Sequence, residues 1–361
     1  VANNALAPTD VGAGIEGYAT THANGTGPFK VTSRKPDVET VFEVNKDWWD
    51  KPQHNLDGVE FRPIASDATR VASLLSGEVD MIAPVPLQDV DRIAATEGLK
   101  VVENPSLRTI FLVFSYRPEL HAAPGKPNPL LDVRVRQALW HAIDADTIQK
   151  RLMRGKSRTA AMLVAPAVTG YDESIDVPLP YDVDKAKALL AEAGYPDGFK
   201  TGLGCPNDRY IADEQICLAV ASMWAKVGVQ AELSVESKTT YFPRTDKGEF
   251  DSYLLGWASL PPMDGFSPLQ ALLATNDGVF GGSNADGLSN PEIDKLAHAA
   301  AVELDEAKRV DLLKQAFRIT HDQVLYLPLH QQPVAWAMSD KVDMPQFPDE
   351  YVRPWFAQIQ K

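Results

Sequence analysis

The sequence predicts an α/β fold with mixed sheets, and three observations support this prediction. Segments with the alternating pattern of β-strands are interspersed with segments of helical periodicity along the whole chain. The helical segments begin at capping residues and end near glycines. The chain has 361 residues and is 44% hydrophobic, which is enough for two domains or one large one. Strands that alternate with helices are typical of the α/β class.

The first recognisable segment is a glycine-rich turn at residues 24–31, NGTGPFKV. Its glycines and lysine would suit a phosphate-binding loop, but Pro28 removes a backbone donor and no helix follows. We therefore interpret the segment as a turn in which Gly25 and Gly27 allow unusual dihedral angles. The rough alternation of Val, Thr and Phe over residues 29–45 then predicts a β-hairpin.

Helix signals follow in the next part of the chain. Ser66 or Asp67 is a suitable N-cap for a helix that stops at Gly77, and a short strand is predicted around Met81 and Ile82. By the same signals the sequence predicts helices over residues 132–144, 182–194 and 213–228, and two more that begin at Asn290 and near Asp305.

Strand signals occupy the intervening segments. Residues 229–236, VQAELSVE, alternate cleanly between apolar and polar side chains, and residues 250–257, FDSYLLGW, predict another strand. Residues 325–338, LYLPLHQQPVAWAM, are predicted to be extended. Between them, residues 258–287 are rich in Pro, Gly and Asn and predict a long loop.

Charge and motif content disfavour several classes of function. A net charge of −14, from 35 basic and 49 acidic residues, would repel nucleic acid and anionic lipid. None of the seven histidines forms an HExxH motif, so we predict no metal; a site at His321 and His330 is a disfavoured alternative. There is no GxSxG motif and no cysteine placed like a protease nucleophile. The sequence therefore favours a binding protein over an enzyme.

Two cysteines, Cys205 and Cys217, permit two interpretations. They can be buried thiols that pack as small apolar residues. Alternatively, they form a short-loop disulfide, which would indicate an oxidising compartment and stabilise the fold by roughly 3 kcal/mol. Two cysteines with no histidine nearby supply too few ligands for zinc. We expect the disulfide.

An ordered series of segments resembles the family 5 extracellular solute-binding proteins, which are the peptide, dipeptide and nickel-type receptors of ABC importers. The resemblance covers the chain from Asn24 almost to its C-terminus, with the same blocks in the same order. The matching blocks are residues 24–31, 42–50, 56–82, 130–148, 181–199, 224–233, 248–257 and 327–336.

The resemblance implies a two-lobed periplasmic-binding-protein fold, large and type II-like, with mixed sheets flanked by helices and closure on the ligand by hinge bending. It places residues 1–114 in lobe one, 115–327 in lobe two and 328–361 in lobe one again. Family members carry a larger N-terminal portion before the glycine-rich turn, so we expect that portion of lobe one to be missing here. Trp48 and Trp49 are expected to pack in lobe one.

The resemblance also implies ligand-binding residues in the loop after the Gly-Trp strand. In peptide-binding members an aspartate of this loop pairs with the α-ammonium of the ligand, and Asp264 is the only carboxylate in the matching segment GWASLPPMDGFSP. The alternative is that Asp264 forms an Asx turn before Gly265. Trp257 can form an apolar wall of the cleft or pack in the core.

A second loop, PNDRY, carries an arginine, whose positive charge complements the negative charge of Asp264. Arg209 can take a ligand carboxylate bidentately, with Asn207 donating to it and Tyr210 beside them. The alternative is that Asn207 or Asp208 caps the following helix while Arg209 is solvated. Tyr241, which follows the alternating strand, can line the same cleft or pack in the core.

These expectations combine into one functional hypothesis. The chain is expected to be a monomeric substrate-binding protein that delivers a small solute, here a short peptide, to an ABC permease without a cofactor. We expect it in the periplasm, or outside the cell on a lipidated N-terminus. The alternatives are a non-peptide solute such as an opine, oligosaccharide or metal chelate, and a sensory receptor. An amide hydrolase is least favoured, because no nucleophile–base pair is visible.

Overall fold

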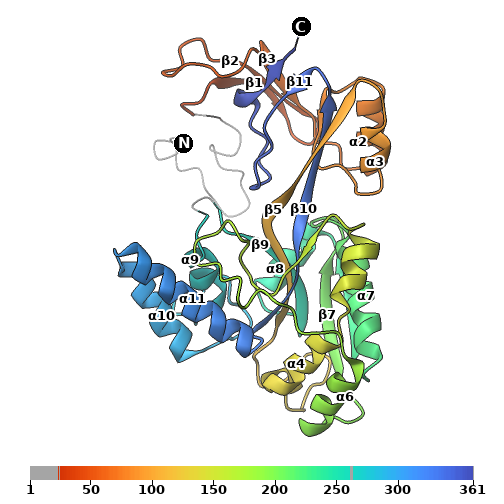
Figure 1. The fold of residues 1–361 in the computed structure, drawn as a ribbon, viewed down its shortest axis with the longest axis vertical. Coiled ribbons are helices and arrows are strands. Elements are labelled where there is room, and N and C mark those ends of the chain that lie inside the picture. The colour runs from red at the N-terminus through yellow and green to blue at the C-terminus, as the bar shows by residue number, and fades with distance from the viewer. Residues whose placement is uncertain (1–22, 24, 261–262, 361) are drawn as a thin grey trace. The chain divides into compact units, whose positions relative to one another are not determined.

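The computed structural model describes residues 23, 25–260 and 263–360, and the chain divides into two compact units (Figure 1). One unit combines the N-terminal part of the chain up to Asn104 with the C-terminal part from Ala335, and the other is Pro105–Val334. The chain passes from one unit to the other within strands β5 (Leu99–Phe114) and β10 (Tyr326–Ser339). The lobe boundaries expected at residues 114 and 328 fall in the same two strands.

The first unit contains the predicted hairpin. Strands β1 (Phe29–Lys35) and β2 (Glu39–Val44) pair antiparallel, and β3 (Gly58–Phe61) extends them to a three-stranded sheet. Two short strands near the C-terminus, β11 (Val342–Asp343) and β12 (Gln358–Ile359), pair with each other. The hairpin prediction is confirmed.

Two expectations for this region were wrong. Gly27 has no positive φ, so the turn does not need the dihedral freedom of glycine there, and Asn24 lies outside the described residues. Trp49 is 78% exposed, although its indole N–H donates to the carbonyl of Thr26. The expectation that it packs in lobe one was therefore wrong for Trp49, whereas Trp48 is half-buried.

The remaining elements of the first unit form a small core. Helix α2 (Asp67–Leu75) begins at Ser66, whose hydroxyl accepts the Thr69 N–H, and Gly77 follows its end with a φ of 74°. Strand β4 (Met81–Ile82) pairs with β10, and helix α3 (Val90–Ala94) comes next. The buried side chains of these elements are Val71, Leu74, Ile82, Val85, Val90, Ile93, Ala335 and Ala337.

The second unit is built on a mixed sheet, as predicted. Its strands follow the order β10–β5–β9–β7–β8, and β6 (Arg158–Thr159) pairs with β10. Strand β9 (Ser252–Ala258) is antiparallel to β5 but parallel to β7 (Lys200–Pro206), which is parallel to β8 (Gln230–Glu236). Consequently β7, β8 and β9 all end at the same edge of the sheet.

Helices cover this sheet, and the predicted N-caps form. The side chains of Asp132, Asp182, Asn290 and Asp305 each accept a backbone N–H at a helix start. Helix α7 contacts β7 and β8, α4 contacts α6, and α10 lies beside α11 (Figure 1). No helix in the described part of the chain has both the length and the apolar character needed to cross a membrane. The helices are α4 (Val133–His141), α5 (Ala145–Thr147), α6 (Val183–Glu192), α7 (Asp213–Ala225), α8 (Lys238–Thr245), α10 (Pro291–Val302) and α11 (Glu306–Asp322), with short helical turns at Pro129–Leu131 and Ile148–Leu152.

The predicted long loop after β9 is partly helical. It contains α9 (Phe266–Pro268) and a π-helical turn over Leu269–Leu273. Leu269, Leu272 and Leu273 are buried in the main core of the unit. The prediction of a long loop was wrong for this segment. The Pro, Gly and Asn residues suggested a loop, but they flank a short apolar segment that packs into the core.

A disulfide joins the sheet to its covering helix. Cys205 lies near the end of β7 and Cys217 lies in α7, with 6.4 Å between their Cα atoms. Both residues are fully buried. The bond therefore fixes α7 against the strand that it covers.

A buried arginine joins two helix ends. Arg136 of α4 is 4% exposed, and its Nη1 donates to the carbonyls of Leu130 and Leu131 at 2.6 and 3.0 Å. Its Nη2 donates to the Gln323 carbonyl at 2.8 Å, and its Nε to the Val324 carbonyl at 2.9 Å. These carbonyls belong to the C-terminal end of α11, where the helix dipole is negative and stabilises a cation.

The turn held by Arg136 has an unusual backbone. The Val324 N–H donates to the His321 carbonyl and the Leu325 N–H to the Thr320 carbonyl, which is the bonding pattern of a Schellman motif. The left-handed position of this motif usually holds glycine, but here Val324 takes it with a φ of 45°. For a β-branched residue this conformation costs about 1–2 kcal/mol. The hydrogen bonds from Arg136 offset that cost.

Replacing this guanidinium should destabilise the protein strongly. Arg136→Lys keeps the charge but has at most three N–H donors, so buried carbonyls lose their partners. We expect a loss of about 3 kcal/mol of unfolding free energy, measured by denaturant unfolding. Arg134→Lys on the same helix is the control, since its 45% exposed side chain should make the change cost less than about 0.5 kcal/mol. Equal losses in the two variants would contradict this assignment.

A buried carboxyl makes stability depend on pH. Asp286 is 2% exposed, its Oδ2 accepts the Tyr253 hydroxyl at 2.7 Å, and its Oδ1 has no partner among the described residues. Burial raises the pKa of Asp286 from 3.8 to about 6. The folded protein therefore holds this proton more tightly than the unfolded chain does. Below pH 3.8 the carboxyl is protonated in both states and does not affect stability. As the pH rises from 3.8 to about 6, the unfolded chain ionises more readily than the folded protein, so the folded state loses stability.

Asp286→Asn should remove this pH dependence. Asparagine keeps the shape and an oxygen that accepts from Tyr253, but it carries no charge. Between about pH 4.5 and pH 8, we expect the variant to gain on the order of 2 kcal/mol relative to wild type. Denaturant unfolding of both proteins at several pH values measures the difference. A stability difference that stays constant with pH would refute a raised pKa at Asp286.

Candidate functional site

The candidate site is the edge of the second unit's sheet where β7, β8 and β9 end. Parallel strands bring the loops that follow them to one edge, and ligands of α/β proteins bind outside such carboxyl ends. Here the loop after β7 carries residues 207–212, and the loop after β9 leads to α9. These are the two loops in which the sequence places its candidate residues.

The loop after β7 is held by a buried carboxylate. Asp213 is 3% exposed, and its Oδ2 accepts the backbone N–H groups of Arg209 and Tyr210, both at 2.9 Å. Ala212, directly before it, has a left-handed φ of 55°. Burial raises the pKa of the Asp213 carboxyl, against the opposing effect of its backbone hydrogen bonds. Two hydrogen bonds to a buried carboxylate thus fix the backbone of this loop.

The capping alternative for this loop was wrong. The N-cap of α7 is Ala212, which has no side-chain cap bond. The Asp208 carboxylate instead accepts the backbone N–H of Lys238 at 2.6 Å. Asn207 is exposed. Neither residue is therefore needed to begin α7.

Two arginines meet at one tyrosine in what we term the Tyr210 cluster, which consists of Arg108, Arg209, Tyr210 and Gly256. The Arg209 guanidinium lies 4.9 Å from the centroid of the Tyr210 ring, and the Arg108 guanidinium, from β5, lies 5.9 Å from it. Arg108 Nη1 donates to the Gly256 carbonyl at 3.3 Å, and the Tyr210 hydroxyl donates to the same oxygen at 3.5 Å. Sequence reasoning missed Arg108, because only the pairing of β5 with β9 brings it here.

Glycine at position 256 makes room for this cluster. A Cβ there would lie 2.7 Å from atoms of both Ile110 and Tyr210, and 3.1 Å from the Arg108 Cδ. Arg108 pairs with Ala258 and Ile110 with Gly256, so their side chains share one face of the sheet. The missing side chain lets Tyr210 lie directly on the strand.

Trp257 lies on the opposite face of β9 from the Tyr210 cluster. It pairs with Thr109, and its indole N–H donates to the Ser267 hydroxyl at 3.2 Å. The ring packs partly buried against the main core of the unit. Trp257 therefore links the end of β9 to the loop that carries Asp264.

Asp264 has an arginine partner that the sequence did not reveal. Its Oδ2 lies 2.6 Å from Arg309 Nη1 and its Oδ1 lies 3.2 Å from Nη2, in a bidentate pair with helix α11. Its Oδ1 also accepts the Phe266 N–H at 2.8 Å, so the expected Asx turn forms. Met263, directly before it, has a left-handed φ of 52°. An arginine on a distant helix gives no local signal in the sequence.

Tyr241 lies in the core. It is fully buried in α8, and its hydroxyl donates to the Leu254 carbonyl at 2.7 Å. Burial raises the pKa of this phenol well above its ordinary value. In this structure the side chain offers no exposed surface to a ligand, so core packing accounts for it.

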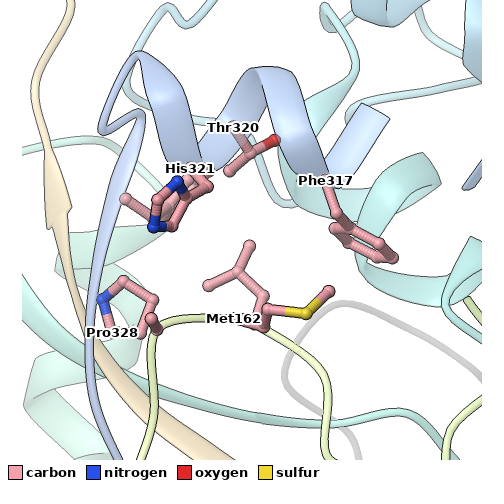
Figure 2. A pocket seen from close by; sticks show the side chains of 8 residues that line it. Met162, Phe317, Thr320, His321 and Pro328 are labelled. Atoms are coloured by element: carbon pink, nitrogen blue, oxygen red, sulfur yellow. The ribbon is translucent and has the colours of Figure 1, made fainter. Parts of the chain in front are cut away.

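The histidine pair considered for a metal does not gather further ligands. Among the described residues no group of three His, Cys, Asp or Glu is placed to hold a metal ion. His330 is buried in β10, and burial lowers its pKa to about 4. His321 borders a cavity of about 10 Å³, which is room for one water and too small for a solute (Figure 2).

The chain matches a known family over most of its length. Residues 3–278 match the bacterial extracellular solute-binding proteins, family 5 Middle. The dipeptide-binding protein of Escherichia coli is 30% identical over 310 residues, which is 83% of this chain and 54% of the relative. The heme-binding protein A of Haemophilus influenzae is 28% identical over 316 residues, which is 84% of this chain and 54% of that relative. The chain thus spans about half the length of these relatives.

The fold is also similar to solved structures. An ABC transporter-associated periplasmic binding protein, DppA from Helicobacter pylori in complex with the peptide STSA, superimposes with a TM-score of 0.77 at 24% identity. The match covers 93% of this chain and 63% of that one. The predicted periplasmic-binding-protein architecture is confirmed by this likeness.

Gly256→Ala should disturb the Tyr210 cluster. The added methyl group has no space beside the Tyr210 ring, so we expect a loss of about 1–3 kcal/mol, measured by thermal or denaturant unfolding. Gly282→Ala is the matched control, because a Cβ there meets no atom within 4 Å and its φ is not positive. If both alanine variants are equally stable, Gly256 is not needed for close packing.

Proposed function

Because the chain belongs to the bacterial extracellular solute-binding proteins of family 5, we propose that it captures a short peptide and passes it to an ABC permease. The observation that supports a peptide is the placement of opposite charges in two loops at one edge of one sheet. Arg209 follows β7 and Asp264 follows β9, and these strands run parallel. A free peptide carries the two complementary charges at its ends.

Arg209 is suited to the peptide carboxylate. In the described part of the chain its guanidinium forms no ion pair, and it rests on the Tyr210 ring. A planar guanidinium can bind a carboxylate through two parallel hydrogen bonds, which are stronger than neutral ones. The exposed amide of Asn207 lies two residues away and can donate to the same group.

Asp264 is suited to the peptide ammonium, but both of its carboxylate oxygens already accept hydrogen bonds from Arg309. The two oxygens accept three N–H bonds, from Arg309 and Phe266, whereas a carboxylate offers about four acceptor sites. The side chain is 18% exposed. We infer that the ammonium takes the remaining site or displaces one arginine bond.

The same proposal covers location and role. A Cys205–Cys217 disulfide is favoured in an oxidising compartment, which suits the periplasm or a lipid-anchored position outside the cell. The family is one of solute-binding proteins, and we propose a monomer that binds without catalysis. Hinge closure stays a prediction from the resemblance, with β5 and β10 as the strands expected to bend.

The direct test is a thermal-shift and calorimetric titration with Ala-Ala, N-acetyl-Ala-Ala and Ala-Ala-amide. The free dipeptide should stabilise the protein by about 2.7 kcal/mol at 100 times its dissociation constant. Blocking either end removes one charge and should weaken binding at least tenfold. Binding of heme or a nickel chelate without any binding of peptides would overturn the peptide proposal.

Variants of the Asp264–Arg309 pair separate a ligand contact from a structural one. If Asp264 holds the ammonium, Asp264→Asn should weaken Ala-Ala binding at least tenfold, while Arg309→Gln frees the carboxylate and preserves or tightens binding. Asp172→Asn is the control, since Asp172 also forms an Asx turn and pairs with Arg318 of the same helix at 2.9 Å. Equal binding by Asp264→Asn and Asp172→Asn would assign Asp264 to structure alone.

A further inference from the structure

We propose that the Cys205–Cys217 disulfide acts in ligand binding, because it positions the loop that carries Arg209. This role rests on the proposed function, in which Arg209 binds the peptide carboxylate. Cys205 lies near the end of β7, and Cys217 lies in the second turn of α7. The residues between the two cysteines include the whole of the site loop, 207–212. The bond therefore closes this loop covalently at its base.

The first turn of α7 lacks the side-chain cap that usually fixes a helix start. Its N-cap, Ala212, makes no side-chain cap bond and has a left-handed φ of 55°. A helix start without such a cap is less stable. Cys217 lies four residues after Asp213, on the same side of the helix, and Cys205 Sγ lies 3.3 Å from the Asp213 carbonyl oxygen. The disulfide thus holds the first turn of α7 against β7.

That first turn carries Asp213, whose carboxylate binds the loop. Its Oδ2 accepts the backbone N–H groups of Arg209 and Tyr210, both at 2.9 Å, and its Oδ1 accepts that of Glu214 at 3.0 Å. Asp213 is 3% exposed, so a shift of the turn would leave a buried carboxylate and two backbone donors poorly bonded. The Arg209 guanidinium rests on the Tyr210 ring, 4.9 Å from its centroid. The position of this cation therefore depends on Asp213, and through Asp213 on the disulfide.

The expected benefit is a cation that is held in place before the ligand arrives. A guanidinium fixed in this way loses little conformational freedom when it binds a carboxylate. Without the disulfide, α7 remains packed on the sheet through its fully buried side chains, which include Ile216, Val220 and Trp224. Loss of the bond should therefore free the loop more than it disturbs the helix.

The test compares the oxidised and reduced forms of the same 361-residue chain by calorimetry, so that no residue changes. Because the disulfide is fully buried, the chain is unfolded in guanidinium chloride with dithiothreitol and refolded with this dithiol present. The dithiol gives two electrons and two protons to the disulfide and becomes a cyclic disulfide, which leaves thiols at Cys205 and Cys217. The reduced protein should bind Ala-Ala about tenfold more weakly, whereas its affinity for Ala-Ala-amide should change less than about twofold.

Hydrogen exchange gives a readout that needs no ligand. The backbone N–H groups of Arg209 and Tyr210 should exchange about tenfold faster in the reduced protein. Asp213→Asn keeps the disulfide but leaves one acceptor oxygen for three N–H groups, so it should show the same selective loss of Ala-Ala binding. This variant also tests the proposal if the reduced chain does not refold.

Leu190→Ala is the matched control, since it removes a buried side chain of α6. It should lower the unfolding temperature, as reduction does, but leave the loop exchange and both affinities unchanged. Equal affinity of the oxidised and reduced forms for Ala-Ala would overturn the role of the disulfide and leave the peptide proposal intact. An equal loss for both peptides, or unchanged loop exchange, would also overturn it. If neither form binds any peptide, the proposed function fails and this role fails with it.

Discussion

The Arg136 guanidinium sets the constraint on which much of the second unit depends. It binds carbonyls at the end of α11 and at the start of α4, and so fixes where β10 begins. Strand β10 pairs with β5, β6 and β4, so an error at its start would shift the register of the sheet. A cation is costly to bury, yet here the guanidinium makes five hydrogen bonds to backbone carbonyls, some of them at the negative end of a helix.

Strained backbone recurs where the structure must turn sharply. Val324 ends α11 in a left-handed conformation, and Ala212 and Met263 take it in the two loops of the candidate site. Each of the two site residues is followed by an aspartate whose oxygens accept backbone N–H groups, Asp213 and Asp264. Strained residues persist only where their surroundings fix them, and they gather at binding sites. Carboxylates thus hold the two loops that carry the candidate ligand-binding residues.

The sequence alone determined the fold class, the hairpin β1–β2, the longer helices and strands β4, β8, β9 and β10, but not β5 or β7. Local signals suffice there, because an N-cap such as Asp132 or a terminal glycine such as Gly77 acts within one helical turn. Alternation identified β8 and β9 for the same reason. The ordered blocks gave the family, since each block preserves a local structure. Composition also failed where a short apolar segment, Leu269–Leu273, lies inside a loop-like region.

Tertiary structure decided which side chains meet at the site. Arg309 reaches Asp264 from another helix, and Arg108 reaches Tyr210 through the pairing of β5 with β9. Neither contact can be predicted from the local sequence, because each depends on how elements far apart in the chain pack together. Burial also decided between the cleft and the core for Tyr241, and Trp49 is exposed although it was expected to pack in lobe one. Propensity acts between neighbours in the chain, whereas charge pairing and burial act between neighbours in space.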